Sequence, residues 1–307
     1  MTPSGPGSFW DLTTGAIHRR LHRWWYGAGH SLPLGGVFPE KRAVSPHAVK
    51  PLSPVDRLAL AQKIWGEGNL LPGSSDMLMT LIKPVGVNSA MSLLDLTSRL
   101  GGPSRHLAHV ADVYITGMER SGEKAKLGHR MSVDAGLGRK IPITHFDPDT
   151  VELRLHAYDA VYWEFLTYSL EDKDRLLREV MRSLKPRGQI AFYEYVLAEN
   201  ADPEDPRLRG LRNLDPYALK PWRESDYKNC LRNIGFDLRI SMDASEQLRH
   251  GVIQGFNNFI LSNDLRQMQR SHLMAVLDEA DLWMNRLRMA ESGLLRPYRF
   301  YAISKQK

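Results

Sequence analysis

The chain has 307 residues, of which 42% are hydrophobic and 25% are charged. This composition is typical of a folded globular protein and excludes wholesale disorder. It has no run of about 18 apolar residues, so we expect no transmembrane helix, and no apolar segment follows Met1, so we expect no secretory signal. The single cysteine, Cys230, excludes an internal disulfide and a cysteine-based zinc site. We therefore expect a cytoplasmic protein.

The positive charge is unevenly placed. Residues 1–60 hold seven Lys or Arg and three Asp or Glu, so +4 of the net charge of +6 lies in that segment. A nucleic-acid-binding protein concentrates a much larger excess on one face. The charge therefore predicts a basic N-terminal arm and no nucleic-acid partner.

Residues 1–57 are predicted to form this arm, because proline and glycine interrupt them repeatedly. One helix is expected within it, at residues 10–26, with tryptophans near one face and arginines on the other. Such a helix can lie on an anionic membrane. Three interpretations stay open: peripheral membrane or protein contact through residues 10–26, packing on the protein's own core, and a mitochondrial transit segment.

Residues 58–307 are predicted to form one domain of alternating strands and helices, with a core at 90–200. Apolar runs predict strands at 92–96, 113–118, 160–163, 189–196, 236–241 and 299–304, and helical periodicity predicts helices at 55–65, 76–82, 104–110, 121–130, 173–184 and 225–234. A long helical stretch at about 254–290 forms most of an insertion at 244–292, and the last strand suits an antiparallel edge. The pattern predicts an α/β fold with a mostly parallel sheet and helices on both faces.

Four segments in order carry a resemblance to a known family. LLDLTSRLGGPSRHLA (93–108) resembles the first motif of class I S-adenosylmethionine-dependent methyltransferases, and YITGMERS resembles the second. HFDPDTVELRLHAYDAVYWEFLTYSLEDK is similar to the third and fourth motifs, and RLLREVMRSLKPRGQIAFYEYV matches the helix and turn before the fifth strand. WGEGNLLPG (65–73) is similar to a segment of small-molecule methyltransferases that act on amines. The resemblance implies a Rossmann-like seven-stranded sheet and S-adenosylmethionine as cofactor.

The resemblance also implies roles for individual residues. Asp95 would orient the methionine end of the cofactor through its ammonium group, and Gly101 would keep the glycine-rich turn before a helix. Glu119, at the end of the second strand, would accept the ribose hydroxyls, and Asp147 would accept the adenine amino group. Glycines in such a turn let backbone amides approach a ligand closely.

The first motif departs from the family pattern at two positions. Thr97 and Arg99 replace the first two glycines, and Arg187 replaces a glycine in the later LKPGG turn. Threonine must avoid a positive φ angle at position 97, whereas Arg99 brings a cation to the cofactor site. Arg99 would either bind the cofactor carboxylate or repel its sulfonium.

Two readings of function follow. The first is methyl transfer to a small molecule (an amine, a phenol or a lipid-like compound), in which positioning supplies most of the catalysis. Tyr162 and Glu164, expected just after a strand at the rim of the site, are the candidate bases for a protonated acceptor. The alternative is a catalytically inactive homologue that acts as a binding or assembly module. No metal-ligand spacing is present, and the oligomeric state stays open.

Overall fold

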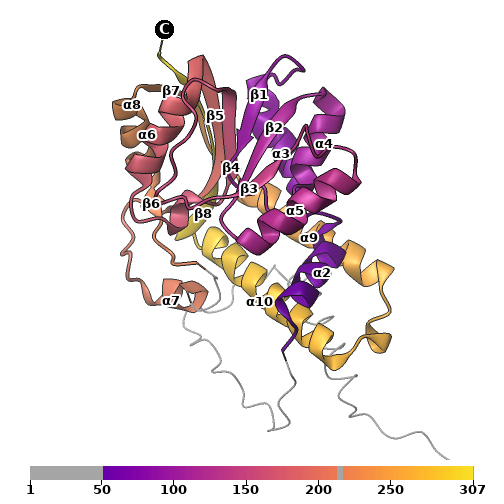
Figure 1. Cartoon of the computed structure of the whole chain (residues 1–307). Coiled ribbons are helices and arrows are strands. Elements are labelled where there is room, and N and C mark those ends of the chain that lie inside the picture. The colour runs from indigo at the N-terminus through magenta and orange to yellow at the C-terminus, as the bar shows by residue number, and fades with distance from the viewer. Residues whose placement is uncertain (1–50, 213–216, 307) are drawn as a thin grey trace, which may run out of the picture.

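The computed structural model describes residues 51–212 and 217–306 (Figure 1). The helices are α2 (Pro54–Trp65), α3 (Ser74–Ile82), α4 (Gly102–Ala111), α5 (Gly122–Asp134), α6 (Lys173–Ser183), α7 (Pro206–Arg212), α8 (Glu224–Ile234), α9 (Ser245–Ser262) and α10 (Arg270–Glu291), with short 3-10 helices η1 (Lys83–Val85), η2 (Thr167–Ser169) and η3 (Leu265–Gln267). The strands are β1 (Ser92–Asp95), β2 (Tyr114–Glu119), β3 (Ile143–His145), β4 (Tyr158–Glu164), β5 (Leu184–Leu197), β6 (Trp222–Arg223), β7 (Phe236–Asp243) and β8 (Leu295–Ser304). The helix predicted at residues 10–26 lies outside the described residues. The proposed boundary of the arm at residue 57 stays a prediction.

The strands form one mostly parallel sheet, which confirms the predicted fold class. Their order is β3-β2-β1-β4-β5-β8-β7, and the two-residue β6 pairs with β5. β8 is antiparallel to both β5 and β7. The prediction that this last strand forms an edge is wrong, because β7 takes the edge. The burial explains the order: Phe300 and Ala302 of β8 are fully buried, whereas the second half of β7 is largely exposed.

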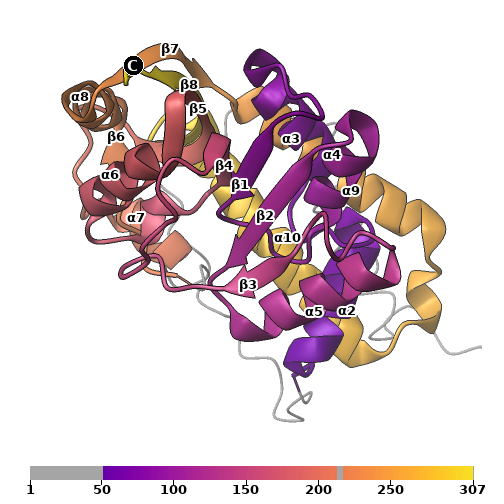
Figure 2. The same cartoon turned by 45° about the horizontal axis from the view of Figure 1, so that its top comes forward.

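Helices cover both faces of the sheet, with α3, α4 and α5 on one face and α6 and α8 on the other (Figures 1 and 2). Successive residues of a strand point to opposite faces, and β4 shows this directly. Its Tyr162 belongs to the apolar core shared with α3 and α4, whereas Trp163 belongs to the core shared with α6 and α8. Because both faces are buried, the strands are apolar runs rather than alternating patterns.

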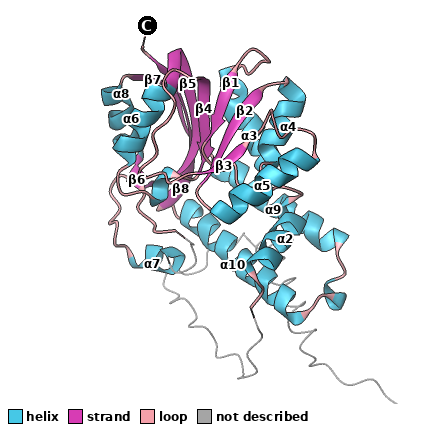
Figure 3. Cartoon of the chain, viewed as in Figure 1, coloured by secondary structure: helices cyan, strands magenta, loops and turns pink. Residues whose placement is uncertain are grey.

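The predicted helical insertion consists of two helices instead of one stretch. α9 ends at Ser262, η3 follows, and α10 begins at Arg270 (Figure 3). α9 packs closely on the segment that joins α2 to α3: a Cβ at Gly251 would lie 2.9 Å from the backbone nitrogen of Gly73, and one at Gly255 would lie 2.4 Å from the Trp65 ring. The insertion therefore holds residues 65–73 in place.

The strand order reverses between β1 and β4. β1 pairs with β2 on one side and with β4 on the other, and all three run parallel. Chains leave the carboxyl ends of such neighbouring strands in opposite directions, and ligands of α/β proteins bind in the crevice that results. The carboxyl ends of the parallel strands face α7 and α10 (Figure 1). In the described residues no helix is both long and apolar enough to cross a membrane.

Candidate ligand site at the carboxyl ends of β1, β2 and β4

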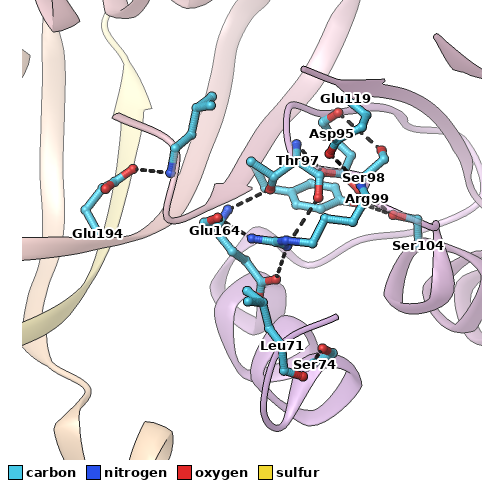
Figure 4. Close-up of polar contacts among 12 residues, drawn as sticks. Leu71, Ser74, Asp95, Thr97, Ser98, Arg99, Ser104, Glu119, Glu164 and Glu194 are labelled. Atoms are coloured by element: carbon cyan, nitrogen blue, oxygen red, sulfur yellow. Dashed lines mark hydrogen bonds and ion pairs between the residues drawn. The ribbon is translucent and has the colours of Figure 1, made fainter. Parts of the chain in front are cut away.

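Asp95 ends β1 and is buried among polar partners. One carboxylate oxygen accepts a hydrogen bond from the backbone N–H of Thr97 at 2.9 Å, and the other accepts one from the Ser104 hydroxyl at 2.5 Å. Burial raises the pKa of the Asp95 carboxyl, and the hydrogen bonds from Ser104 and Thr97 oppose that rise. Asp95 therefore fixes the turn after β1 and ties it to the first turn of α4, as Figure 4 shows.

The turn between β1 and α4 keeps left-handed backbone where the family pattern has glycines, with one exception. Arg99 has a φ of 49° and Gly101 a φ of 76°, whereas Thr97 is not among the residues with positive φ. A left-handed conformation costs a residue with a side chain roughly 1 to 2 kcal/mol. The strain of the altered motif is therefore at Arg99, and Thr97 avoids it. Arg187, at the other glycine replacement, also has a positive φ, 59°.

The side chain of Arg99 spans from this turn to the end of β4 (Figure 4). Its guanidinium donates to the Glu164 carboxylate at 3.1 Å, to the Glu164 carbonyl oxygen at 2.6 Å and to the Thr97 carbonyl oxygen at 3.2 Å. The Thr97 hydroxyl in turn accepts a hydrogen bond from the Glu164 N–H at 2.9 Å. These contacts join both sides of the crevice between β1 and β4.

Glu164 is the more buried partner of this ion pair. Its side chain is 6% exposed, against 17% for Arg99. Burial raises the pKa of Glu164 to about 7, although the Arg99 charge lowers it; the charge of Asp95 adds to the rise. Glu164 thus changes its charge near neutral pH, which is the range that suits a general base.

The glycines at the start of α4 make a close contact between chain segments. The Gly102 N–H donates to the Gly68 carbonyl oxygen at 3.1 Å. A Cβ on Gly102 would lie 2.7 Å from that oxygen, and one on Gly101 would lie 2.7 Å from Ile143. Glycine is therefore required at both positions. The WGEGNLLPG segment singled out in the sequence lies directly on the turn that the first motif forms.

Glu119 ends β2 and already accepts two backbone hydrogen bonds. One oxygen accepts the Arg99 N–H at 3.1 Å and the other accepts the Ser121 N–H at 2.8 Å. The residue is 4% exposed. A carboxylate has about four acceptor sites, so Glu119 keeps capacity for a pair of hydroxyl donors beside the β1–α4 turn.

Asp147 lies two residues after the end of β3 and is exposed. Its carboxylate accepts the Asp149 N–H at 3.0 Å and the Thr150 hydroxyl at 3.0 Å. The hydrogen bond from the Asp149 backbone, followed by that from Thr150, lowers the pKa of Asp147. Both of these partners belong to the same loop as Asp147. Its proposed role toward adenine stays a prediction.

Tyr162 and Glu164 do not follow β4, as the sequence suggested, but lie within it. Tyr162 is 3% exposed, and its hydroxyl lies 2.9 Å from the Ser104 hydroxyl on the α4 side of the sheet. Burial, with the nearby charge of Asp95, raises its pKa well above the ordinary value. The expectation that Tyr162 is at the rim of the site is therefore wrong, because β4 continues for two residues after Tyr162 and ends at Glu164. Only Glu164 reaches the carboxyl end.

Three further polar residues belong to the site and were not predicted from the sequence. Ser104 joins Asp95 to Tyr162, and Glu194 of β5 accepts four hydrogen bonds from the Trp163 ring and from the backbone N–H groups of residues 166, 167 and 168. Arg120 donates to the Ser169 hydroxyl at 2.8 Å, and its guanidinium lies 3.8 Å from the centre of the Tyr217 ring. Arg120 directly follows Glu119, so its position in the second motif was the available signal.

A family model described as a methyltransferase domain matches residues 94–192. Those residues include the second half of β1, all of β2 and β4 and most of β5, and therefore Asp95, Arg99, Glu119 and Glu164, but not Gly68 or Glu194. Residues 94–192 form a class I methyltransferase domain. In the described part of this chain, no group of three or more His, Cys, Asp or Glu side chains is placed to hold a metal ion.

Sequence relatives and solved structures agree with the domain assignment. The sterol 24-C-methyltransferase of Aspergillus fumigatus is 24% identical over 170 residues, which are 54% of this chain and 45% of the relative. The chain thus matches less than half the length of that enzyme. Phosphoethanolamine N-methyltransferase 2 of Haemonchus contortus, solved with phosphomonomethylethanolamine and S-adenosylhomocysteine, superposes with a TM-score of 0.71 and 15% identity, over 81% of this chain and 57% of the other.

The fold also carries other chemistry. The [4+2]-cyclase SpnF superposes on this chain with a TM-score of 0.65 and 18% identity, over 81% of this chain and 93% of the other. These structural likenesses show the fold, and the reaction must be argued from the site.

Proposed function

We propose that the chain binds S-adenosylmethionine between the carboxyl ends of β1, β2 and β4 and transfers its methyl group to a small molecule. The observation that supports this most is Glu119, a buried carboxylate at the end of β2 with unused acceptor capacity. A ribose diol requires such a partner. The acceptor class is an amine, a phenol or a lipid-like compound, and the names of the relatives support the amine and the lipid-like compound.

The site fits the cofactor unequally at its two ends. At the ribose end, Glu119 is already oriented by two backbone N–H groups. At the amino-acid end, both oxygens of Asp95 already accept hydrogen bonds, so we assign the ammonium group to Glu164 instead of Asp95. The acceptors on Glu164 are held by Arg99. Binding of the ammonium group there requires the guanidinium to move. The proposal therefore includes a movement of the Arg99 side chain.

The chain's own residues do little chemistry in this proposal. The sulfonium of S-adenosylmethionine supplies an already activated methyl group, so catalysis consists mainly of alignment. A protonated amine or phenol must lose a proton, and Glu164, with a pKa raised by burial to about 7, is in the range that suits a base. In this proposal, however, its carboxylate holds the ammonium group of the cofactor, so we do not assign Glu164 the role of base. Tyr162 is too deeply buried for this role.

The test is calorimetric titration of the full chain with S-adenosylmethionine and S-adenosylhomocysteine. We expect micromolar binding, and we expect Glu119→Ala to weaken it by roughly 1.5 to 3 kcal/mol, which is the size of hydrogen bonds to a charged group. Glu123→Ala is the matched control, since Glu123 is an exposed residue of α5. Loss of affinity in both variants, or in neither, removes Glu119 from the site.

A second candidate function is a binding or assembly module without catalysis. The Arg99–Glu164 ion pair favours it, because the protein's own side chain fills the place where a cofactor cation would bind. Transfer of a labelled methyl group to amine, phenol and sterol acceptors separates the two. Transfer of the label to any of these acceptors supports the enzyme. If S-adenosylmethionine does not bind even at millimolar concentration, the result supports the binding or assembly module.

A further inference from the structure

Three acceptors at the carboxyl end of β4 and the facing turn form a receptor for a cation. They are the carboxylate and the carbonyl oxygen of Glu164 and the carbonyl oxygen of Thr97, and the Arg99 guanidinium binds all three. Hydrogen bonds between charged partners are roughly twice as strong as neutral ones. The crevice therefore already contains a bound cation, and this cation is part of the chain.

The groups packed around the receptor are mainly acidic or neutral. The charge of Asp95, at the end of β1, raises the pKa of Glu164. Tyr193 is the partner of Glu164 on the neighbouring strand β5, and the Glu164 charge raises its pKa. From α5, Lys124 lies near Glu119 and Arg99. A second cation in the receptor would meet repulsion from Arg99 and Lys124, so one cationic group fits there at a time.

The backbone of Arg99 is fixed, but its side chain is partly exposed and can change rotamer. Its N–H is bound by Glu119, and its φ of 49° belongs to the turn itself. The side chain is 17% exposed, and an arginine side chain turns about several single bonds without moving the backbone. Exchange of the guanidinium for another cation thus needs only rotamer changes.

We propose that Arg99 is an intramolecular competitor for the cation receptor on Glu164, so that a ligand with a primary ammonium group binds only after displacing the guanidinium. This inference rests on the proposed function, in which the ligand is S-adenosylmethionine. The ammonium group of the cofactor binds the receptor on Glu164. Arg99 reduces the apparent affinity for the cofactor to the fraction of time during which the guanidinium is not bound there. Arg99 then determines how much cofactor the domain needs, rather than how it reacts.

The test compares dissociation constants of S-adenosylmethionine and S-adenosylhomocysteine for the full chain and for Arg99→Asn. Asparagine removes the guanidinium and tolerates the left-handed backbone. We expect both ligands to bind at least tenfold more tightly to the variant, because both carry the ammonium group. Arg187→Asn is the matched control: it makes the same change at an exposed position with the same backbone conformation, and we expect it to leave both constants unchanged.

The outcomes separate this inference from the proposed function. Equal micromolar binding by the wild type and Arg99→Asn overturns the competitor and keeps the cofactor site. Weaker binding by Arg99→Asn overturns it too, because Arg99 is then a ligand of the cofactor. A gain for S-adenosylmethionine alone overturns the assignment of the receptor to the ammonium group. No binding by either protein overturns the proposed function itself.

A pH series gives an independent readout. Protonation of Glu164 removes the negative partner of Arg99 and weakens the competitor. We expect the ratio of the wild-type to the Arg99→Asn dissociation constant to be several-fold smaller at pH 6 than at pH 8. A ratio that is constant or grows as the pH falls contradicts the role of the Glu164 carboxylate in holding Arg99.

Discussion

The guanidinium of Arg99 lies 3.1 Å from the carboxylate of Glu164 and bridges the carboxyl ends of two neighbouring parallel strands. Both residues are mostly buried, and 65 residues separate them in the chain. The pair stands where the strand order of the sheet reverses, which is where α/β proteins bind their ligands. The relationship between these two residues therefore decides whether the crevice accepts a ligand.

We expect the Arg99 and Glu164 side chains to stabilise each other measurably. A double-mutant cycle with Arg99→Met, Glu164→Gln and the double variant should give a coupling free energy of unfolding of about 1.5 to 3 kcal/mol, the size of a hydrogen bond to a charged group with little solvent screening. Urea unfolding measures it. The matched control is Arg178 with Asp174, an exposed pair on α6, for which solvent screening leaves a much smaller coupling. Equal coupling in the two pairs would contradict the account.

Glu164 should make stability depend on pH. The pKa of Glu164 is raised to about 7 in the folded state from 4.5, so between these values the folded state binds a proton that the unfolded state has lost. Stability therefore falls as pH rises from about 4.5 to 7. Urea unfolding at pH 5 and pH 8 measures this. Between the two pH values, the free energy of unfolding should fall by about 2 kcal/mol more in the wild type than in Glu164→Gln. Parallel pH dependences in the two proteins would show that Glu164 has no raised pKa.

Gly102 and Gly122 provide a matched pair at the first residues of α4 and α5. A Cβ on Gly102 would lie 2.7 Å from the Gly68 carbonyl oxygen, whereas one on Gly122 would have its nearest neighbour at 3.8 Å. We expect Gly102→Ala to destabilise the fold by about 1 to 3 kcal/mol through overpacking. Gly122→Ala should be neutral or stabilising by up to about 1 kcal/mol. Thermal unfolding of both variants measures this, and equal effects would mean that residues 65–73 do not press on the turn.

Glu194 should be essential to the segment that follows β4. It accepts the N–H groups of Leu166, Thr167 and Tyr168 while fully buried. Burial raises its pKa, and the backbone hydrogen bonds oppose the rise. Glu194→Ala leaves these donors unpaired, at about 1 to 3 kcal/mol for each buried group that finds no water.

The control for Glu194 is Glu171→Gln, an exposed residue paired with Lys220. We expect Glu194→Ala to lower the free energy of unfolding by at least about 2 kcal/mol, and the control to lower it by less than about 1 kcal/mol. Amide hydrogen exchange should also speed up at residues 166–168 in Glu194→Ala alone. Unchanged protection there would show that other groups hold the segment.

The sequence predicted the parts of the sheet that are apolar on both faces. β1, β2 and β4 were found because buried parallel strands are continuous apolar runs. β3 was missed because it has three residues, two of them exposed. The start of β5 was missed because Lys185, Pro186, Arg187 and Gly188 have the composition of a turn, although the strand begins at Leu184.

For the site, the sequence identified the important position without its partner. The replacement of a glycine by Arg99 marked the decisive departure from the family pattern. Its contact with Glu164 depends on which strand neighbours β1 and on the register that places Asp95 beside Tyr162. Neither the strand order nor the register is visible in local patterns, and Glu164 was a candidate base for a different reason.

The most direct test of the account is a crystal structure of the Arg99→Asn variant with S-adenosylhomocysteine, beside one of the unliganded wild type. The account predicts the ligand between the carboxyl ends of β1 and β4, its ribose hydroxyls on Glu119 and its ammonium group on Glu164. In the unliganded wild type, Arg99 should occupy that same place. A ligand bound elsewhere, or an ammonium group that does not contact Glu164, would contradict the account.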